Sequence, residues 1–112
     1  MFGNLQIFQM ASALASHAGT RQTLIAQNIA NADTPGYKSQ DLKSFRETFE
    51  RPQPGVQKSD IFTPSGSTSP NGNSVSLEEE MVKAGQVKRD HDQALAIYRS
   101  SLTILRAAIG RR

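Results

Sequence analysis

The sequence predicts a mainly α-helical protein in which long N- and C-terminal helices pair as a coiled coil around an irregular central insert. Near both ends of the 112-residue chain, apolar residues recur at alternating spacings of four and three, which is the heptad pattern of a coiled-coil helix. Proline, glycine and serine are concentrated between these stretches and exclude a long helix from the middle. We therefore divide the chain into residues 1–36, 37–74 and 75–112, which together form one structural domain.

The N-terminal helix is expected from Leu5 to Ala32, where a heptad row runs along one face. The row contains Ile7, Ala11, Leu14, Ala18, Arg21, Ile25 and Asn28. Its alanines let a neighbouring helix come close but add little burial energy, because a buried Leu or Ile is worth roughly 1.5–3 kcal/mol and alanine much less. An isolated helix of this length is marginal in water, so we expect a partner helix. We predict that the assembly contacts of this helix are Ile7, Leu14 and Ile25.

The central insert, residues 37–74, is expected to be irregular. Its apolar residues stand alone among charged and turn-forming residues, and the segment 63–73 (TPSGSTSPNGN) has the composition of a flexible loop. The pattern allows short β-strands near residues 55–57 and 60–63. It equally allows a helical turn within residues 42–50.

The C-terminal helix is expected to begin at Ser76, which with Glu79 has the form of a capping box. Three successive glutamates suit the positive end of this helix, arginines suit its negative end, and Gly110 ends it. A second heptad row follows the helix; it is polar at its centre, at Lys88 and His91, and strongly apolar beyond. We predict that the assembly contacts of this helix are Met81, Leu95, Tyr98, Leu102, Leu105 and Ile109.

Residues 28–38 (NIANADTPGYK) have the pattern of a helix end followed by a rigid turn. Thr34 precedes a proline and is therefore pushed toward extended backbone, while Pro35 lacks a backbone N–H group. Gly36 permits the positive φ that a tight turn often needs, and Tyr37 can pack its ring with the hydroxyl still hydrated. Asn31 can satisfy open backbone groups at the helix end with its short side chain.

Composition and charge limit the functional classes. With 13 basic against 10 acidic residues the net charge is +3, but the basic residues are scattered and form no stripe that could follow phosphates. The chain has no cysteine, and no apolar run approaches the ~18 residues of a membrane span. The first residues lack the pattern of a secretory signal, so we expect that any export leaves the N-terminus uncleaved.

Catalysis and metal binding find little support in the sequence. His17 and His91 are the two histidines, and Asp90, His91 and Asp92 point in different directions on a helix, so they cannot converge on one atom. The motifs of phosphate-binding loops and nucleophile elbows are missing. We expect no enzyme activity, no cofactor, no metal site and no small-molecule substrate. Two hypotheses remain: a subunit that assembles with other helices, or a small basic coiled-coil adaptor that binds nucleic acid or an anionic surface.

Two motifs resemble those of flagellar axial proteins. Residues 28–38 resemble the ANxxTxGY signature that rod, hook and hook-associated proteins carry behind their N-terminal helix. Residues 72–81 (GNSVSLEEEM) are similar to the start of the last helix in the proximal rod family of the bacterial flagellar basal body, the FlgB family. The resemblance covers both ends of the chain and leaves the central insert unmatched.

The resemblance implies a structural subunit of the proximal rod, the part of the drive shaft that crosses the periplasm. It implies export by the flagellar type III apparatus without signal cleavage, and helical assembly through the terminal coiled-coil helices. The implied partners are copies of the same chain, other rod proteins, and the basal-body adaptor that joins the rod to the membrane ring, with no nucleic acid. The motif residues that take a structural role at the turn are Asn28, Asn31, Thr34, Pro35, Gly36 and Tyr37.

Overall fold

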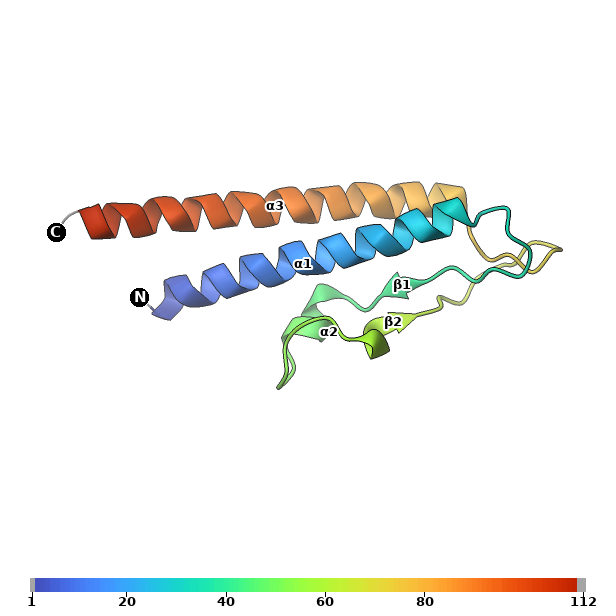
Figure 1. Ribbon diagram of the computed structural model, residues 1–112, viewed down its shortest axis with the longest axis horizontal. Helices are drawn as coiled ribbons and strands as arrows, with labels where there is room; N and C mark the ends of the chain where they lie inside the picture. Colours follow the sequence, from blue (N-terminus) through green and yellow to red (C-terminus); the bar gives the residue numbers. More distant parts are fainter. Residues whose placement is uncertain (1, 111–112) are drawn as a thin grey trace.

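The computed structural model describes residues 2–110 and shows an elongated molecule built on two long antiparallel helices (Figure 1). The helices α1 (Phe2–Ala30) and α3 (Leu77–Gly110) lie side by side, and the chain reverses direction at what we call the turn end. The first residues of α1 and the last of α3 lie at the opposite, free end. The molecule measures 67 × 27 × 15 Å. The prediction of a mainly helical protein with paired terminal helices is confirmed.

The central insert contains a short two-stranded sheet. Strand β1 (Asp41–Leu42) pairs antiparallel with strand β2 (Ile61–Phe62). The helix α2 (Phe45–Phe49) and the 3₁₀ turn η1 (Lys58–Asp60) lie between the two strands in the sequence. β2 falls within residues 60–63, one of the two stretches where the sequence allowed a strand, but residues 55–57 form no strand and β1 lies outside both stretches. α2 falls within the stretch where the sequence allowed a helical turn.

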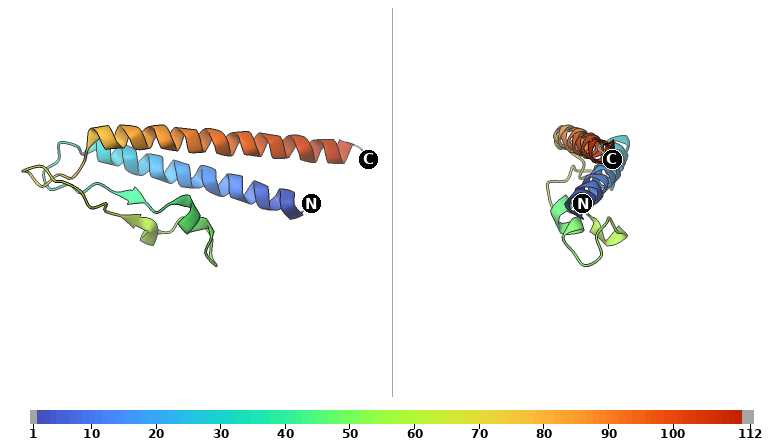
Figure 2. Two further views of the ribbon diagram at one scale, coloured as in Figure 1. Left: turned by 180° about the vertical axis from the view of Figure 1, so that it is seen from behind. Right: turned by 90° about the vertical axis from the view of Figure 1, so that its left-hand side faces the viewer.

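α1 is the central layer of the molecule, because α3 covers one of its faces and the insert covers another (Figure 2). Toward α3, Ala18 and Ile25 form a buried cluster with Val87. Toward the insert, the ring of His17 packs edge-on against Phe45 of α2, with ring centroids 5.8 Å apart. The sequence predicted one buried row on this helix. The structure shows a second one, since the insert folds back along α1.

Local sequence determines where the long helices end and begin. α1 ends at Ala30, and the Nδ2 of the next residue, Asn31, donates to the Gln27 carbonyl over 2.8 Å. α3 begins after Ser76, whose hydroxyl accepts a hydrogen bond from the Glu79 N–H over 3.3 Å. This bond satisfies one of the open N–H groups of the first turn, as expected for a helix cap.

Candidate functional site

The last turn of α1 carries a buried polar residue that joins three parts of the chain. Asn28 has 0% of its surface exposed. Its Oδ1 accepts hydrogen bonds from the Gln40 N–H over 3.0 Å and from the Tyr37 hydroxyl over 3.1 Å. Its Nδ2 donates to the Gln40 carbonyl over 2.8 Å and to the carboxylate of Glu80 on α3. The amide therefore uses both of its donor hydrogens and both acceptor positions within the protein.

Glu80 is a buried carboxylate with 1% of its surface exposed. It lies in the first turn of α3, where the helix dipole favours a negative charge. The Lys83 ammonium lies 3.4 Å from its Oε2 and 3.7 Å from the carboxylate of Asp41 in β1. Burial, together with the charge of Glu80, raises the pKa of the Tyr37 hydroxyl. Because a buried charge is tolerated only when it is paired and hydrogen-bonded, Glu80 depends on Asn28 and Lys83.

A second buried amide, that of Asn73, ties the approach to α3 to the turn after α1. Its Nδ2 donates to the carbonyls of Asn31 and Thr34 over 2.8 and 2.7 Å. Its Oδ1 accepts from the Val75 N–H over 2.8 Å. The two buried amides thus connect residues that are 39 to 52 positions apart in the chain. We call the joined residues the turn clasp: Asn28, Asn31, Thr34, Gly36, Tyr37, Gly72, Asn73 and Glu80.

Two glycines let the halves of the turn clasp touch. Gly36 and Gly72 have φ angles of 77° and 85°, in the left-handed region that other residues rarely adopt. The Gly36 N–H donates to the Asn71 carbonyl over 2.9 Å. A Cβ atom on Gly72 would lie 3.3 Å from the Cα of Gly36, closer than most Cβ contacts, so a side chain there would require the two backbones to shift apart by a few tenths of an ångström. Gly36 thus has the positive φ that the sequence led us to expect.

The structure places most of the predicted motif residues in the turn clasp. Besides the contacts above, the Thr34 hydroxyl donates to the Oδ1 of Asn31 over 3.1 Å and closes the turn within the motif itself. Pro35 is exposed and lies outside this network. The hydrogen bonds are consistent with a structural role for the motif at the turn. Its contribution to assembly stays a prediction.

Arg21, a polar member of the predicted α1 row, lies beside a buried carboxylate of the insert. Its Nε and Nη2 donate to the two oxygens of Asp41 over 3.0 and 3.3 Å, and its Nη1 donates to Gln86 on α3 over 3.4 Å. Burial alone would raise the pKa of Asp41, but hydrogen bonds from Arg21 and from the Leu42 N–H lower it. Arg21 therefore connects α1 with the insert and with α3.

The insert has an ion pair of its own, which the sequence analysis did not identify. Arg51 binds Asp60 through two hydrogen bonds of 2.7 Å and also donates to the Gly55 carbonyl. The Gln57 N–H donates to Asp60 over 2.7 Å. These hydrogen bonds, chiefly those from Arg51, lower the pKa of Asp60 to about 2. The pair spans nine residues of irregular chain, where no helical or strand spacing indicates a contact.

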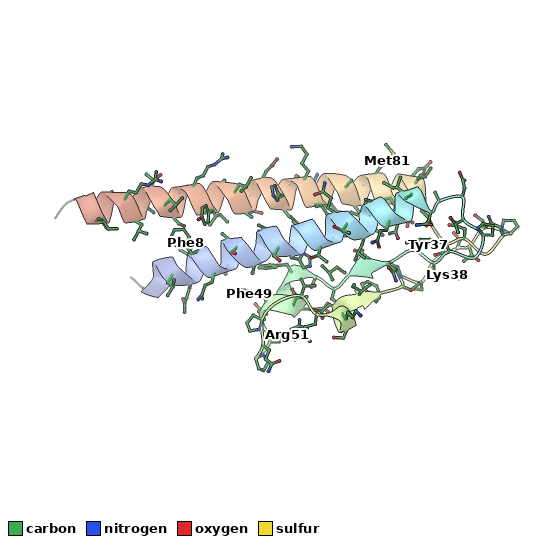
Figure 3. The ribbon with its side chains drawn as sticks, viewed as in Figure 1. Phe8, Tyr37, Lys38, Phe49, Arg51 and Met81 are labelled. Carbon is green, nitrogen blue, oxygen red and sulfur yellow. The ribbon has the colours of Figure 1, made fainter. Side chains whose placement is uncertain are left out.

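α3 carries two neighbouring rows at heptad spacing, and the row that packs on α1 lies one residue before the predicted assembly row. The buried residues of this helix are small or polar: Glu80, Val87, Ala94 and Ser101. In the predicted row, Met81 is 69% exposed and points away from α1 (Figure 3). Small side chains allow the close approach that the alanine-rich α1 offers, so the row of larger residues remains outside.

The predicted assembly residues occupy different environments along the two helices. On α1, Ile25 is buried, Leu14 is half-buried and Ile7 is exposed. On α3, two residues are half-buried and the others are exposed; the half-buried ones are Leu102 and Leu105, and the exposed ones are Met81, Leu95, Tyr98 and Ile109. The assembly role of these side chains stays a prediction.

Toward the free end, one residue of the predicted α3 row contacts α1. The ring of Tyr98 meets Phe8 of α1 edge-on, with centroids 5.3 Å apart. A straight α-helix drifts by about 20° per heptad relative to a strict seven-residue repeat. Drift of this kind can bring single residues of the row, such as Tyr98, beside α1, whereas Ile109 farther along the helix remains 62% exposed.

The two histidines lie in different environments, and neither belongs to a cluster of acidic side chains among the described residues. His17 is buried, and its Nε2 lies 2.7 Å from the Lys43 carbonyl, whereas His91 is exposed. Asp92 pairs with Lys88 over 3.0 Å. Among residues 2–110, no three side chains of the metal-binding types gather at one point. In the same range, no helix combines the length and the hydropathy that crossing a membrane requires.

Sequence reasoning missed the roles of Glu80 and Asn73 in the turn clasp. It assigned Glu80 to the helix start together with the two glutamates before it. The spacing of seven residues to Val87, and of seven more to Ala94, could have identified Glu80 as a member of a buried row. Asn73 lies in a low-complexity stretch, where only its place in the second motif distinguishes it from its neighbours.

Part of the chain matches a known protein family. A family model described as flagella basal body rod protein matches residues 11–38. This range covers most of α1 and all of the stretch 28–38, including five residues of the turn clasp.

Two relatives extend the likeness to most of the chain. The flagellar basal body rod protein FlgB of Agrobacterium fabrum is 30% identical over 116 residues, an alignment that covers 86% of this chain and 87% of that protein. The protein of the same name from Buchnera aphidicola subsp. Baizongia pistaciae is 35% identical over 82 residues, which cover 68% of this chain and 60% of that protein. The first alignment thus extends well beyond the two motifs.

Proposed function

Because the chain belongs to the FlgB family of flagellar basal body rod proteins, we propose that it is a subunit of the proximal rod that assembles through its terminal helices. Membership of this family means a structural role in the rod of the basal body, and the family is not one of enzymes. The observation that carries the finer proposal is the row of apolar residues that α3 leaves exposed.

The single chain leaves many of its large apolar residues uncovered. Its buried core contains small residues such as Ala11, Ala18 and Ala94. The large apolar residues that remain exposed on the two helices include Leu5, Ile7, Met10, Leu77, Met81, Leu95, Tyr98 and Ile109. Rows of such residues on long helices mark surfaces that pack against other helices. In the proposed rod, helices of neighbouring subunits cover these rows and form a coiled-coil layer.

The turn clasp supports this proposal by holding the two assembly helices in one register. In this proposal the chain forms one structural domain with three parts: residues 1–36, 37–74 and 75–112. Hydrogen bonds between α1, the insert and α3 support a single domain, since Asn28 bonds to Gln40 and Glu80. A subunit whose helices are fixed relative to each other presents the same outer surface to every neighbour.

Family membership also supports the location and partners in the proposal. The partners are copies of the same chain, other rod proteins, and the adaptor that joins the rod to the membrane ring, with no nucleic acid. The subunit lies in the part of the rod that crosses the periplasm. It arrives through the flagellar type III export apparatus without cleavage of a signal peptide.

Electron microscopy of basal bodies tests the function. A strain that lacks the gene should form membrane rings without a rod, and a strain complemented with the gene should regain the rod. Complete rods and hooks in the deletion strain would contradict the proposal and favour the small basic adaptor.

A matched pair of variants tests assembly through the helices. Leu102→Asp places a charge in the predicted row and should block incorporation into the rod while the chain is still secreted. Thr103→Asp places the same charge at the next, exposed position and should be incorporated. Normal incorporation of the Leu102→Asp variant would refute the assignment of the row.

A further inference from the structure

We propose that neighbouring copies of this chain meet head to tail, with the free-end half of one α3 packed against the turn-end half of the next α3. The inference rests on the proposed rod function. It adds the two faces that meet, the direction of the helices and the offset between copies.

The first face is an apolar row with basic residues beside it. Leu95, Leu102 and Ile109 recur every seven residues on α3, and Arg99 and Arg106 follow at the same spacing next to them. Both arginines are exposed, and 62% of Ile109 is exposed. We call these five residues the basic stripe. Its chemistry calls for a partner surface that is apolar and acidic.

The second face, at the turn end of α3, has that chemistry. An open groove of about 490 Å³ is lined by Arg21, Glu78, Glu79, Val82, Lys83 and Gln86. Its two glutamates are exposed, and its valine is 63% exposed. The arginine and the lysine of the groove lie 3.0 and 3.7 Å from the carboxylate of Asp41. Because these two cations already have an acidic partner, the glutamates determine the charge of what we call the acidic groove.

The positions of the two faces around α3 determine the symmetry of the contact. Glu79 and Arg106 are 27 residues apart in α3, and at 3.6 residues per turn they lie on roughly opposite sides of the helix. A two-fold antiparallel pair uses the same face of both helices, so it cannot bring the acidic groove and the basic stripe together. A contact between different faces of identical chains is heterologous and propagates into rings or helical assemblies.

The charges also determine how far neighbouring copies are shifted. Parallel copies in register would place Glu78 and Glu79 near the same residues of the next copy, where like charges repel. Contact between the acidic groove and the basic stripe requires a shift of about 20 to 28 residues, or about 30 to 42 Å at 1.5 Å per residue. When Arg106 lies beside Glu79 of the next parallel copy, Ile109 lies beside Val82.

Charge reversal tests the pairing of the two faces. The double variant Glu78→Lys, Glu79→Lys makes both faces basic, and the double variant Arg99→Glu, Arg106→Glu makes both acidic. Each alone should require at least about tenfold higher concentration to form multimers, because like charges then meet. An equimolar mixture should recover multimers of alternating composition.

Sedimentation of the full chain measures this association, and circular dichroism checks that the helix content is unchanged. The proposal is overturned by variants that associate like the unchanged chain, or by a mixture that does not recover. An unchanged chain that stays monomeric up to its solubility limit also overturns it, since the partner of the basic stripe is then not a second copy.

Disulfide formation tests the direction and the offset, because the chain has no native cysteine. In the variant Val82→Cys, Ile109→Cys the two thiols of one chain are about 40 Å apart, so any disulfide joins two copies. The parallel contact predicts efficient cross-linking of this variant. The control is the variant Val82→Cys, Thr103→Cys. If the helices were antiparallel with Arg106 beside Glu79, Thr103 would lie beside Val82, so this control would cross-link. Closed covalent dimers of the control would overturn the proposal.

Motility of complemented cells separates this inference from the proposed rod function. In a deletion strain, the unchanged gene should restore swimming, each charge-reversal variant should fail, and their co-expression should restore swimming. If the unchanged gene fails to restore rods, the proposed function is wrong. If it succeeds and the single variants swim equally well, the head-to-tail contact alone is wrong.

Discussion

At the scale of single residues, the molecule depends on two amides buried at the turn end. An amide offers donors and acceptors without a charge, so it can be fully buried when all of them are used. Asn28 meets this condition through Gln40, Tyr37 and Glu80, and Asn73 bonds to carbonyls of the turn after α1. The hydrogen bonds of the family motif at residues 28–38 therefore lie within a single chain.

Replacement of Asn28 by alanine should strongly destabilise the turn clasp. The buried Glu80 carboxylate and the half-buried Tyr37 hydroxyl would each lose a hydrogen-bond partner, and we expect the free energy of unfolding to fall by about 2–4 kcal/mol. Urea unfolding followed by circular dichroism measures this change. Gln27→Ala removes a neighbouring exposed side chain and should change stability by less than about 0.5 kcal/mol. Equal effects of the two changes would contradict the role of Asn28.

Replacing glycine by alanine should change the stability of the protein in opposite directions at Gly72 and Gly85. Gly72→Ala should destabilise by about 1–3 kcal/mol, because φ is positive there and the added Cβ would press on Gly36. Gly85 lies inside α3 with nothing within 4 Å of an added Cβ. Gly85→Ala should therefore stabilise the protein by up to about 1 kcal/mol. Thermal unfolding of the two variants beside the unchanged chain checks both signs, and a stable Gly72→Ala protein would argue against the close contact.

At the scale of elements, α3 packs on α1 with one side and exposes another side to the surroundings. Its row of small and polar residues packs on α1, while the adjacent row of larger residues faces outward. The insert packs on the other side of α1 and is stabilised from within by the Arg51–Asp60 pair. The outer side of α3 is thus left to the proposed assembly.

The Arg51–Asp60 pair makes the stability of the insert sensitive to acid. The pKa of Asp60 is about 2 in the folded protein, against ~3.9 for an aspartate in an unfolded chain. A pKa that is lower in the folded state means that the carboxylate stabilises the fold fully above about pH 4 and loses this contribution as the pH falls toward 2. Asp41, whose pKa is also lowered, acts in the same direction.

Asp60→Asn should lower stability at pH 7 and weaken its dependence on pH between about 4 and 2, because the titrating carboxylate is gone. The free energy of unfolding, measured at several pH values, checks this. Asp92→Asn removes a carboxylate from an exposed pair on α3 and should leave the dependence nearly unchanged. If the free energy of unfolding of Asp60→Asn still falls with acid as much as that of the unchanged protein, Asp60 is not the cause of the acid sensitivity.

At the scale of the whole molecule, stabilising contacts are unevenly distributed along the 67 Å length. The turn clasp and the acid–base contacts of Arg21 and Arg51 lie at the turn end and in the insert. Toward the free end the two helices separate (Figure 1). Phe8 and Tyr98 contact each other edge-on there. Local stability should therefore decrease from the turn end to the free end.

Hydrogen exchange of the free chain should reveal this gradient. Amides of α1 and α3 beside the turn clasp should exchange at least about tenfold more slowly than those near Phe8 and Ile104, because fewer contacts hold the free end. Mass spectrometry of peptides from each half measures the difference. Incorporation into the rod should then slow exchange at the free end. Uniform protection along both helices of a dilute monomer would contradict ordering of the free end by neighbours.

The local features of the protein could be predicted from its sequence. The heptad spacing, the Ser76 cap and the Thr34–Pro35–Gly36 turn led to two long terminal helices around an irregular insert, as found. These features depend on interactions within a few residues, so a single stretch of sequence contains their cause. The two motifs similarly indicated the family before any contact between them was known.

The contacts between distant parts of the chain became known from the three-dimensional fold. It selected the small-residue row of α3 for α1, gave α1 a second buried face, and paired Asn28 with Glu80 and Arg51 with Asp60. A heptad repeat is compatible with more than one facing row, and the polar partners lie up to 52 residues apart. Their choice depends on how closely the three layers approach each other and on which buried polar groups can satisfy one another, and neither is a property of any single stretch.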